Sequence, residues 1–289
     1  MDKPGRNRPV LVTGASKGLG EEIALKLAAE GFHVWAGVRD PENAPIAGAS
    51  TPGITTITLD VTSDESVAAA IRRIEDAEGT LYGLVNNAGI TRRCCFEDFP
   101  ESKIREIFEV NTFGAMRVSR RALPLIRRHG EGRIVMISSV GGRIGSISVA
   151  PYVASKFALE GFAESLALEL KFFNIGVTIV EPGIVKTTIW DENRILPEAR
   201  NRESVYYKLF WSAEALAEKL LGSSTLKPSD VAAAVARTMV SKKPRLREVV
   251  GARAGFVLGM RRHLWGEWFE KIYFGGQQRL IRRRLDASE

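Results

Sequence analysis

A glycine-rich turn near the start of the chain joins a short apolar run to a helical pattern. The apolar run covers Val10–Thr13, and the turn Gly-Ala-Ser-Lys-Gly-Leu-Gly follows at residues 14–20. Beyond the turn, apolar residues recur at helical spacing up to Gly31, at Ile23, Leu25, Leu27 and Ala28. A buried strand that turns directly into a helix begins a βαβ unit, so the chain is constrained to a parallel sheet covered by helices.

Short apolar runs bounded by turn residues alternate with helical patterns along most of the 289 residues. This rhythm predicts a single α/β domain with a doubly wound parallel sheet, in which ligands bind at the carboxyl ends of the strands. The predicted strands are Val10–Thr13, His33–Val38, Ile54–Asp60, Gly83–Asn86, Arg133–Ser138, Val177–Glu181 and Leu246–Val250.

Two segments depart from this rhythm within the predicted domain, residues 1–289. Residues 188–227 form an aromatic-rich insertion, and residues 251–289 form a basic, aromatic C-terminal extension. The core, residues 9–187, carries the cofactor-binding and catalytic motifs. We expect the insertion to be a helical lid over an apolar substrate, although its aromatic residues alternatively anchor it to the core. These residues are Trp190, Tyr206, Tyr207, Phe210 and Trp211.

Composition and charge argue against several functions. The formal net charge is +7, but the basic residues are scattered and no nucleic-acid motif accompanies them, so we expect no nucleic-acid partner. Cys94 and Cys95 are adjacent and cannot join distant segments, which favours a reducing, cytoplasmic compartment. We find no secretory signal and no run of about 18 apolar residues. The three histidines lie far apart, which predicts no metal site.

Tyr152 and Lys156 are four residues apart, so on a helix both side chains reach the same cleft. A phenol with a pKa near about 10 is a poor acid or base at neutral pH. A neighbouring ammonium and the positive ring of an oxidised nicotinamide both lower that pKa by favouring the phenolate. Ser139, which precedes them, is placed to hydrogen-bond a substrate oxygen. The pattern predicts proton transfer coupled to hydride transfer.

These motifs resemble the short-chain dehydrogenase/reductase family over residues 9–250. The glycine turn has the family's Gly-x-x-x-Gly-x-Gly spacing, and the sequence around Ser139 and Tyr152 is most similar to the hydroxysteroid and retinol dehydrogenase branch. That family also builds its substrate lid after the sixth strand. Further matching motifs are Asp60-Val61, Asn86-Asn87-Ala88-Gly89, Asn111, Pro182-Gly183 and Thr187.

The resemblance implies a Rossmann-type fold and a role for each of these residues. The catalytic set is Asn111, Ser139, Tyr152 and Lys156; Lys156 also binds the nicotinamide ribose, and the backbone of Asn111 holds a water that relays protons to it. Asp60 and Val61 would contact the adenine. The complete set of implied cofactor contacts is Gly14, Ser16, Lys17, Gly18, Leu19, Gly20, Arg39, Asp60, Val61, Asn87, Ala88, Gly89, Tyr152, Lys156, Pro182, Gly183, Val185 and Thr187.

The end of the second predicted strand indicates which dinucleotide is bound. Family members that prefer NAD place an acid at the position of Val38, where it accepts hydrogen bonds from the ribose 2′-hydroxyl. Here Val38 is neutral, Arg39 follows it, and Lys17 adds a second cation in the glycine turn. Cations favour a 2′-phosphate, so we predict NADP, with Asp40 as the feature that argues against it.

The favoured function is therefore NADP-dependent interconversion of a ketone and a secondary alcohol on a bulky, apolar substrate. One alternative is reduction of a β-ketoacyl or polyketide group on an acidic carrier protein, which Arg92, Arg93 and the basic extension suggest. Another is a non-catalytic dinucleotide-binding regulator. By resemblance, helices around Lys103–Arg127 and Tyr152–Phe172 would form a homodimer or homotetramer. Weak membrane association through the extension is left open, although packing against the lid or another subunit is favoured.

Overall fold

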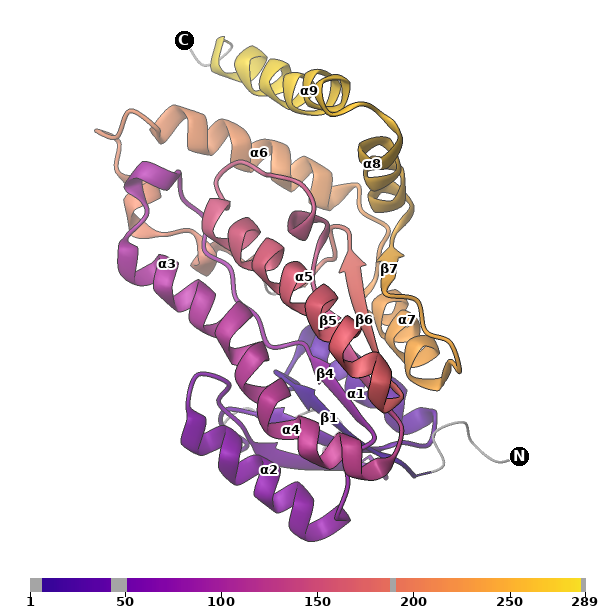
Figure 1. Cartoon of the computed structure of the whole chain (residues 1–289). Helices are drawn as coiled ribbons and strands as arrows, with labels where there is room; N and C mark the ends of the chain where they lie inside the picture. The colour runs from indigo at the N-terminus through magenta and orange to yellow at the C-terminus, as the bar shows by residue number, and fades with distance from the viewer. Residues whose placement is uncertain (1–6, 43–50, 188–190, 287–289) are drawn as a thin grey trace.

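The computed structural model describes residues 7–42, 51–187 and 191–286, and a parallel sheet of seven strands forms its centre (Figure 1). The strands lie across the sheet in the order β3-β2-β1-β4-β5-β6-β7, which confirms the predicted Rossmann-type α/β fold. Their bounds are β1 Pro9–Thr13, β2 His33–Val38, β3 Ile54–Thr58, β4 Gly83–Asn86, β5 Gly132–Ile137, β6 Ile175–Pro182 and β7 Arg247–Val250.

Helices cover both faces of this sheet. Successive strand residues serve opposite faces, as Val10 and Leu11 do, because side chains alternate across a strand. Two buried cores result, which explains why the strands read as unbroken apolar runs. One core is covered by α1 (Gly18–Ala29) and α7 (Pro228–Val240), and the other by α2 (Asp64–Glu78), α4 (Ala115–His129) and α5 (Ala150–Leu170).

The third strand is shorter than predicted. β3 ends at Thr58 because Asp60 turns the chain: its carboxylate accepts hydrogen bonds from the backbone N–H and the hydroxyl of Thr62, at 2.9 and 2.8 Å. Aspartate side chains that bond to the backbone two residues later compete with strand pairing. Asp60 is therefore a turn residue just beyond the sheet.

The order of the strands reverses beside β1. The chain builds β2 and β3 on one side of β1 and then places β4 on its other side. The connections that leave β1 and β4 therefore diverge, and folds of this kind bind ligands in the crevice that opens there.

Further helices lie beyond the sheet. In Figure 1, α6 and α9 run side by side at the end of the molecule toward which β6 points. None of the helices within the described ranges combines the length and apolar content of a membrane span. The remaining helices are α3 (Glu101–Phe108), a π-helical turn at Glu109–Gly114, α6 (Tyr207–Gly222), α8 (Ala252–His263) and α9 (Gly266–Asp286).

Candidate active site

The three glycines of the turn after β1 have two different structural roles. Gly14 and Gly18 adopt φ values of +65° and +61°, in the left-handed region that glycine tolerates best. Gly20 allows close packing, since a Cβ there would lie 2.2 Å from the Gly14 carbonyl oxygen and 2.5 Å from the Asn87 amide nitrogen. The turn can therefore bring bare backbone to the N-terminus of α1, where helices bind phosphate groups.

The ends of β1 and β4 are joined by side-chain hydrogen bonds. The Asn87 amide donates to the carbonyl oxygens of Thr13 and Gly14, at 2.9 and 3.1 Å. In return, the Thr13 hydroxyl accepts from the backbone N–H groups of Asn87 and Ala88, both at 3.0 Å. The sequence predicts Asn87 only as a cofactor contact, and its support of the glycine turn was not predicted. Polar residues that directly follow two strands at one edge of a sheet could have indicated this support.

The remaining predicted cofactor residues border the same crevice. Ser16 is half-buried in the turn, and Leu19 packs against the core that α1 covers. The carbonyl of Val61 accepts a hydrogen bond from Arg117 of α4 at 2.5 Å. Pro182 ends β6, and Gly183 then donates a backbone hydrogen bond to Val250 of β7 at 2.9 Å.

An open pocket connects the glycine turn to the segment after β6. Gly18 and Thr187 both line it, while Val185 is buried beside them in the core. Two predicted contact regions that are distant in sequence are thus adjacent in the fold. The lining residues are Gly18, Lys186, Thr187, Asp191, Glu218, Leu221, Gly222 and Pro228.

Tyr152, Lys156 and Ser139 meet at the carboxyl end of β5. Tyr152 and Lys156 lie one turn apart on α5, and the Lys156 ammonium is 5.8 Å from the centre of the Tyr152 ring. That ammonium is buried and donates to the carbonyl of Ile137 at 2.8 Å. The Ser139 hydroxyl accepts from the Gly141 N–H at 3.0 Å, and it is near enough to the Tyr152 phenol to influence the pKa of that group.

Burial is the main influence on the pKa values of Tyr152 and Lys156. Burial raises the pKa of the Tyr152 phenol, and the Ser139 hydroxyl opposes this with a smaller lowering. The predicted lowering of that pKa involves both Lys156 and an oxidised nicotinamide, and in this structure the Lys156 ammonium donates to the carbonyl of Ile137. Burial lowers the pKa of Lys156 itself to about 8, against the opposing charge of Glu160. Lys156 therefore changes charge close to neutral pH.

Asn111 lies in the π-helical turn Glu109–Gly114, between α3 and α4. Its side chain accepts from the Ile90 N–H at 2.8 Å and donates to the Ile90 carbonyl at 2.9 Å and to the Ser155 hydroxyl at 3.0 Å. Ser155 in turn donates to the carbonyl of Tyr152 at 2.7 Å. An inserted π turn explains an asparagine within a helical stretch, and such turns are frequent at functional sites.

Gly89 brings the loop after β4 close to the π-helical turn and to α5. A Cβ at Gly89 would lie 3.4 Å from the side-chain oxygen of Asn111 and 3.6 Å from the ammonium of Lys156. The backbone of Gly89 therefore lies close to the side chains of both Asn111 and Lys156.

A buried cluster of charges supports α5 one turn beyond Lys156, and sequence analysis missed it. Arg247 of β7 contacts Glu160 at 3.1 Å and Glu181 at 3.0 Å, and Arg143 also contacts Glu181 at 3.1 Å. Burial raises the pKa of Glu160 to about 7. The cluster ties the catalytic helix to β6 and β7.

Cations gather at the end of β2. Arg39 is exposed, as is Lys17 in the glycine turn. The pKa of Arg194 is lowered chiefly by burial and also by the charges of Arg92 and Arg39. Arg194 lies in the insertion, far from Arg39 in sequence, so no local pattern identifies it. Val38 is only 1% exposed and belongs to the core.

The insertion after β6 is joined to the β4 loop by a buried ion pair. Arg93 contacts Glu214 of α6 at 2.9 Å, and both side chains are buried. The backbone of Arg93 also pairs with the insertion, donating to Arg194 and accepting from Leu196. Arg92 contacts Glu106 at 2.7 Å. Arg93 is therefore a buried, paired residue and not an exposed loop charge.

Phe210 anchors the insertion instead of lining a pocket. It is 1% exposed and belongs to a buried cluster with Cys94 and Cys95. Tyr206 donates its hydroxyl to Glu97 at 2.7 Å, and Trp211 contacts Phe210 edge to face. Phe210 therefore anchors the insertion, as the alternative to a substrate lining predicted. Trp190 lies outside the described residues. Burial raises the pKa of the Cys94 thiol to about 12, as expected of an inert thiol.

Comparison with known proteins identifies relatives of this site and fold. The sequence profile "short chain dehydrogenase" matches residues 8–195. Retinol dehydrogenase 8 of Homo sapiens is 37% identical over 85% of this chain and 82% of its own length. 17-beta-hydroxysteroid dehydrogenase type 1 of Homo sapiens is 34% identical over 87% of this chain and 80% of its own. The solved short-chain dehydrogenase of Streptomyces avermitilis is 32% identical, with a TM-score of 0.75 over 93% of this chain and 98% of that one.

These similarities extend through the sheet, the glycine turn and the Tyr152–Lys156 helix. They also match the branch that the sequence around Ser139 suggested. The chain therefore belongs to the short-chain dehydrogenase family, as an oxidoreductase that acts on a CH–OH/C=O pair with a nicotinamide dinucleotide and is similar to retinol and hydroxysteroid dehydrogenases.

Proposed function

We propose that the protein interconverts a ketone and a secondary alcohol on a bulky apolar substrate, with NADP(H) as the cofactor. The observation that carries the proposal is the meeting of Tyr152, Ser139 and Lys156 at the end of β5. A regulator without catalytic activity would have no use for this arrangement.

The residues present fit a dinucleotide along the crevice. The close approach at Gly20 leaves backbone exposed for a pyrophosphate, and Asn87 holds that backbone in place. When bound, the nicotinamide donates or accepts the hydride. Tyr152 gives its phenolic proton to the substrate oxygen during reduction, while the Ser139 hydroxyl steadies the charge that develops there. Lys156 and Asn111 keep the tyrosine and its helix in position.

Substitution of Tyr152 tests this mechanism. Tyr152→Phe removes the proton donor and should reduce kcat by at least about a hundredfold, the usual scale for a general acid. NADPH binding, followed by fluorescence, should be unchanged. Tyr206→Phe serves as the control, because its hydroxyl bonds Glu97 away from the crevice. Undiminished turnover in Tyr152→Phe would rule out the mechanism.

The preference for NADP is supported by the arginines at the end of β2. The charge of Arg39 contributes to lowering the pKa of Arg194, and the glycine turn supplies a further exposed cation, Lys17. A charge-assisted hydrogen bond contributes about 1.5–3 kcal/mol, so Arg39→Ala should reduce the NADPH-to-NADH ratio of kcat/KM by about tenfold or more. Arg72→Ala on α2 is the matched control. Substitution of buried Val38 would disturb the core and is a poor test.

The substrate class is supported by the relatives named for retinol and for hydroxysteroids, which are large apolar alcohols. The carrier-protein alternative loses support, since Arg92 and Arg93 are engaged with Glu106 and Glu214. Catalytic efficiency across ketones of increasing apolar bulk distinguishes the classes. Equal efficiency on small ketones would exclude the bulky-substrate proposal.

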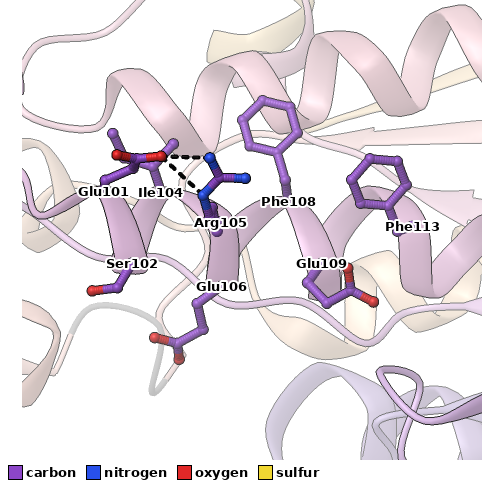
Figure 2. Close-up of a pocket in the computed structure, with 8 residues that line it drawn as sticks. All are labelled: Glu101, Ser102, Ile104, Arg105, Glu106, Phe108, Glu109 and Phe113. Carbon is purple, nitrogen blue, oxygen red and sulfur yellow. Dashed lines mark hydrogen bonds and ion pairs between the residues drawn. The ribbon is translucent and has the colours of Figure 1, made fainter.

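A homodimer or homotetramer is also proposed. The outer side of α5 carries Phe157, Leu168 and, just beyond its end, Phe172, all exposed and spaced along one face. Figure 2 shows an open groove along α3 in which the rings of Phe108 and Phe113 point to the same side. Light scattering should report an oligomer for the unmodified chain and a smaller species for Leu168→Glu. We place the protein in the cytoplasm, which fractionation of the source cells tests.

A further inference from the structure

Helix α9 has one side packed on the protein and one side exposed. Phe269 and Ile281 are buried, and Phe269 packs with Ile144 and Leu258. On the opposite side, Trp268 is 62% exposed and is followed by exposed Ile272, and Trp265, which directly precedes the helix, is 84% exposed. Soluble proteins seldom expose several large apolar side chains together unless that surface binds something.

Cations continue the same stripe at helical spacing. Counting from Trp268 in steps of three or four residues gives Lys271, Ile272, Gly275, Arg279, Arg282 and Arg283. The acids Glu267 and Glu270 fall to one side of this stripe, and Asp286 lies at its end. We call Trp265, Trp268, Lys271, Ile272, Arg279, Arg282 and Arg283 the α9 outer face.

This combination matches the chemistry of an anionic lipid surface. Tryptophan is favoured at the boundary between headgroups and acyl chains, while lysine and arginine attract anionic headgroups. The Lys271 ammonium lies 5.8 Å from the Trp268 ring, so apolar and cationic groups are intermixed at one end of the face. An acidic protein partner would account for the arginines but gives no reason for tryptophans that are exposed beside them.

The position of α9 relates this face to the substrate. α9 runs beside α6, and its Phe274 lies close to Gly145, in the loop that follows Ser139. The face therefore belongs to the end of the molecule that holds the candidate active site (Figure 1). An apolar alcohol or ketone of the proposed class concentrates in bilayers, where this end of the enzyme would meet it.

We propose that the α9 outer face docks the enzyme on anionic membranes, with the substrate side of the protein toward the bilayer. The link to substrate rests on the proposed function, whereas the docking itself does not. Each Lys or Arg near an anionic surface contributes about 1 kcal/mol, or roughly fivefold in affinity. Loss of three arginines should therefore weaken binding by about a hundredfold.

Co-sedimentation with vesicles tests the docking without any activity measurement. The full chain should bind vesicles made of equal parts phosphatidylcholine and phosphatidylglycerol, should bind pure phosphatidylcholine weakly, and should be released by added salt. The variant Arg279→Gln/Arg282→Gln/Arg283→Gln should lose the binding, and Trp265→Ser/Trp268→Ser should weaken it on both vesicles. Arg72→Gln/Arg73→Gln/Lys242→Gln removes the same charge from exposed positions elsewhere and should bind like the unmodified chain.

Two results would overturn the proposal. The first is a failure of the vesicle assay: the unmodified chain stays in the supernatant with anionic vesicles, or the arginine variant binds as tightly as the control. The other is a lipid-free oligomer that dissociates in the tryptophan variant, because the face would then bind a second copy of the chain. Activity on a soluble ketone should be equal in all variants, so that a failure of docking is distinguishable from a failure of the proposed reaction.

Discussion

Replacing Lys156 with methionine should make the protein more stable at neutral pH, although Lys156 belongs to the proposed catalytic set. Burial lowers the pKa of Lys156 from 10.5 to about 8, a change of roughly 2.5 units. One unit corresponds to about 1.4 kcal/mol, so holding the buried ammonium costs roughly 3 kcal/mol at pH 7. Methionine fills a similar volume, and the lost hydrogen bond to Ile137 offsets about 1 kcal/mol of the gain.

The pH dependence gives this prediction its sign. Between pH 8 and 10.5 the unfolded chain binds the lysine proton more tightly than the folded chain does, so the contribution of Lys156 to stability rises with pH. From pH 7 to pH 9, the chain with Lys156 should gain about 1.3 kcal/mol relative to the Lys156→Met variant. The gap between the two proteins should therefore narrow as pH rises.

Urea unfolding of the ligand-free proteins at pH 7, 8 and 9 measures this gap. Glu160, whose pKa is about 7, titrates in the same range and also raises the pKa of Lys156, so both proteins keep Glu160 and the effect of Lys156 is the difference between them. Equal m-values ensure that differences in midpoint report stability. A gap that stays constant with pH, or that widens toward pH 9, would refute the assignment of a buried, destabilising ammonium.

Two further substitutions test the supports of the site. Gly20→Ala places a Cβ against the Gly14 carbonyl, so it should destabilise the fold by about 1–3 kcal/mol and weaken NADPH binding. The control is Gly259→Ala, where a Cβ meets open space and the substitution should be neutral or stabilising. Thermal unfolding and NADPH fluorescence titration compare the two variants. Glu214→Ala removes the carboxylate that Arg93 contacts and should cost about 3–5 kcal/mol in urea unfolding, while Glu101→Ala at an exposed pair should cost about 1 kcal/mol or less. Equal losses in the members of either pair would contradict the packing described.

The parts of the fold that follow local rules were predictable from sequence. Strands buried on both faces read as apolar runs, and the four-residue spacing of Tyr152 and Lys156 placed both on one side of a helix. The predicted end of β3 was wrong because the side chain of Asp60 bonds to the backbone of Thr62 and turns the chain before the apolar pattern ends.

Interactions between distant segments were not predictable in this way. Glu214 meets Arg93, and the charge of Arg39 influences the pKa of Arg194, only because the insertion folds back over the β4 loop. Burial, which raises the pKa of Tyr152 in the absence of a dinucleotide, is likewise not specified by the sequence. The π turn at Asn111 differs from an ordinary helix by a single inserted residue and leaves no periodic signature.

The attachment of the insertion to the β4 loop also limits how this enzyme can be redesigned. The ion pair between Arg93 and Glu214, the backbone pairing around Ile195 and the packing of Phe210 on Cys94 and Cys95 join two stretches about a hundred residues apart. A lid transplanted from a relative with another specificity would arrive without its partners on that loop. Exchange of residues 91–96 together with the insertion is the smallest graft that keeps these contacts. Variation in substrate preference among such chains should therefore involve both stretches at once.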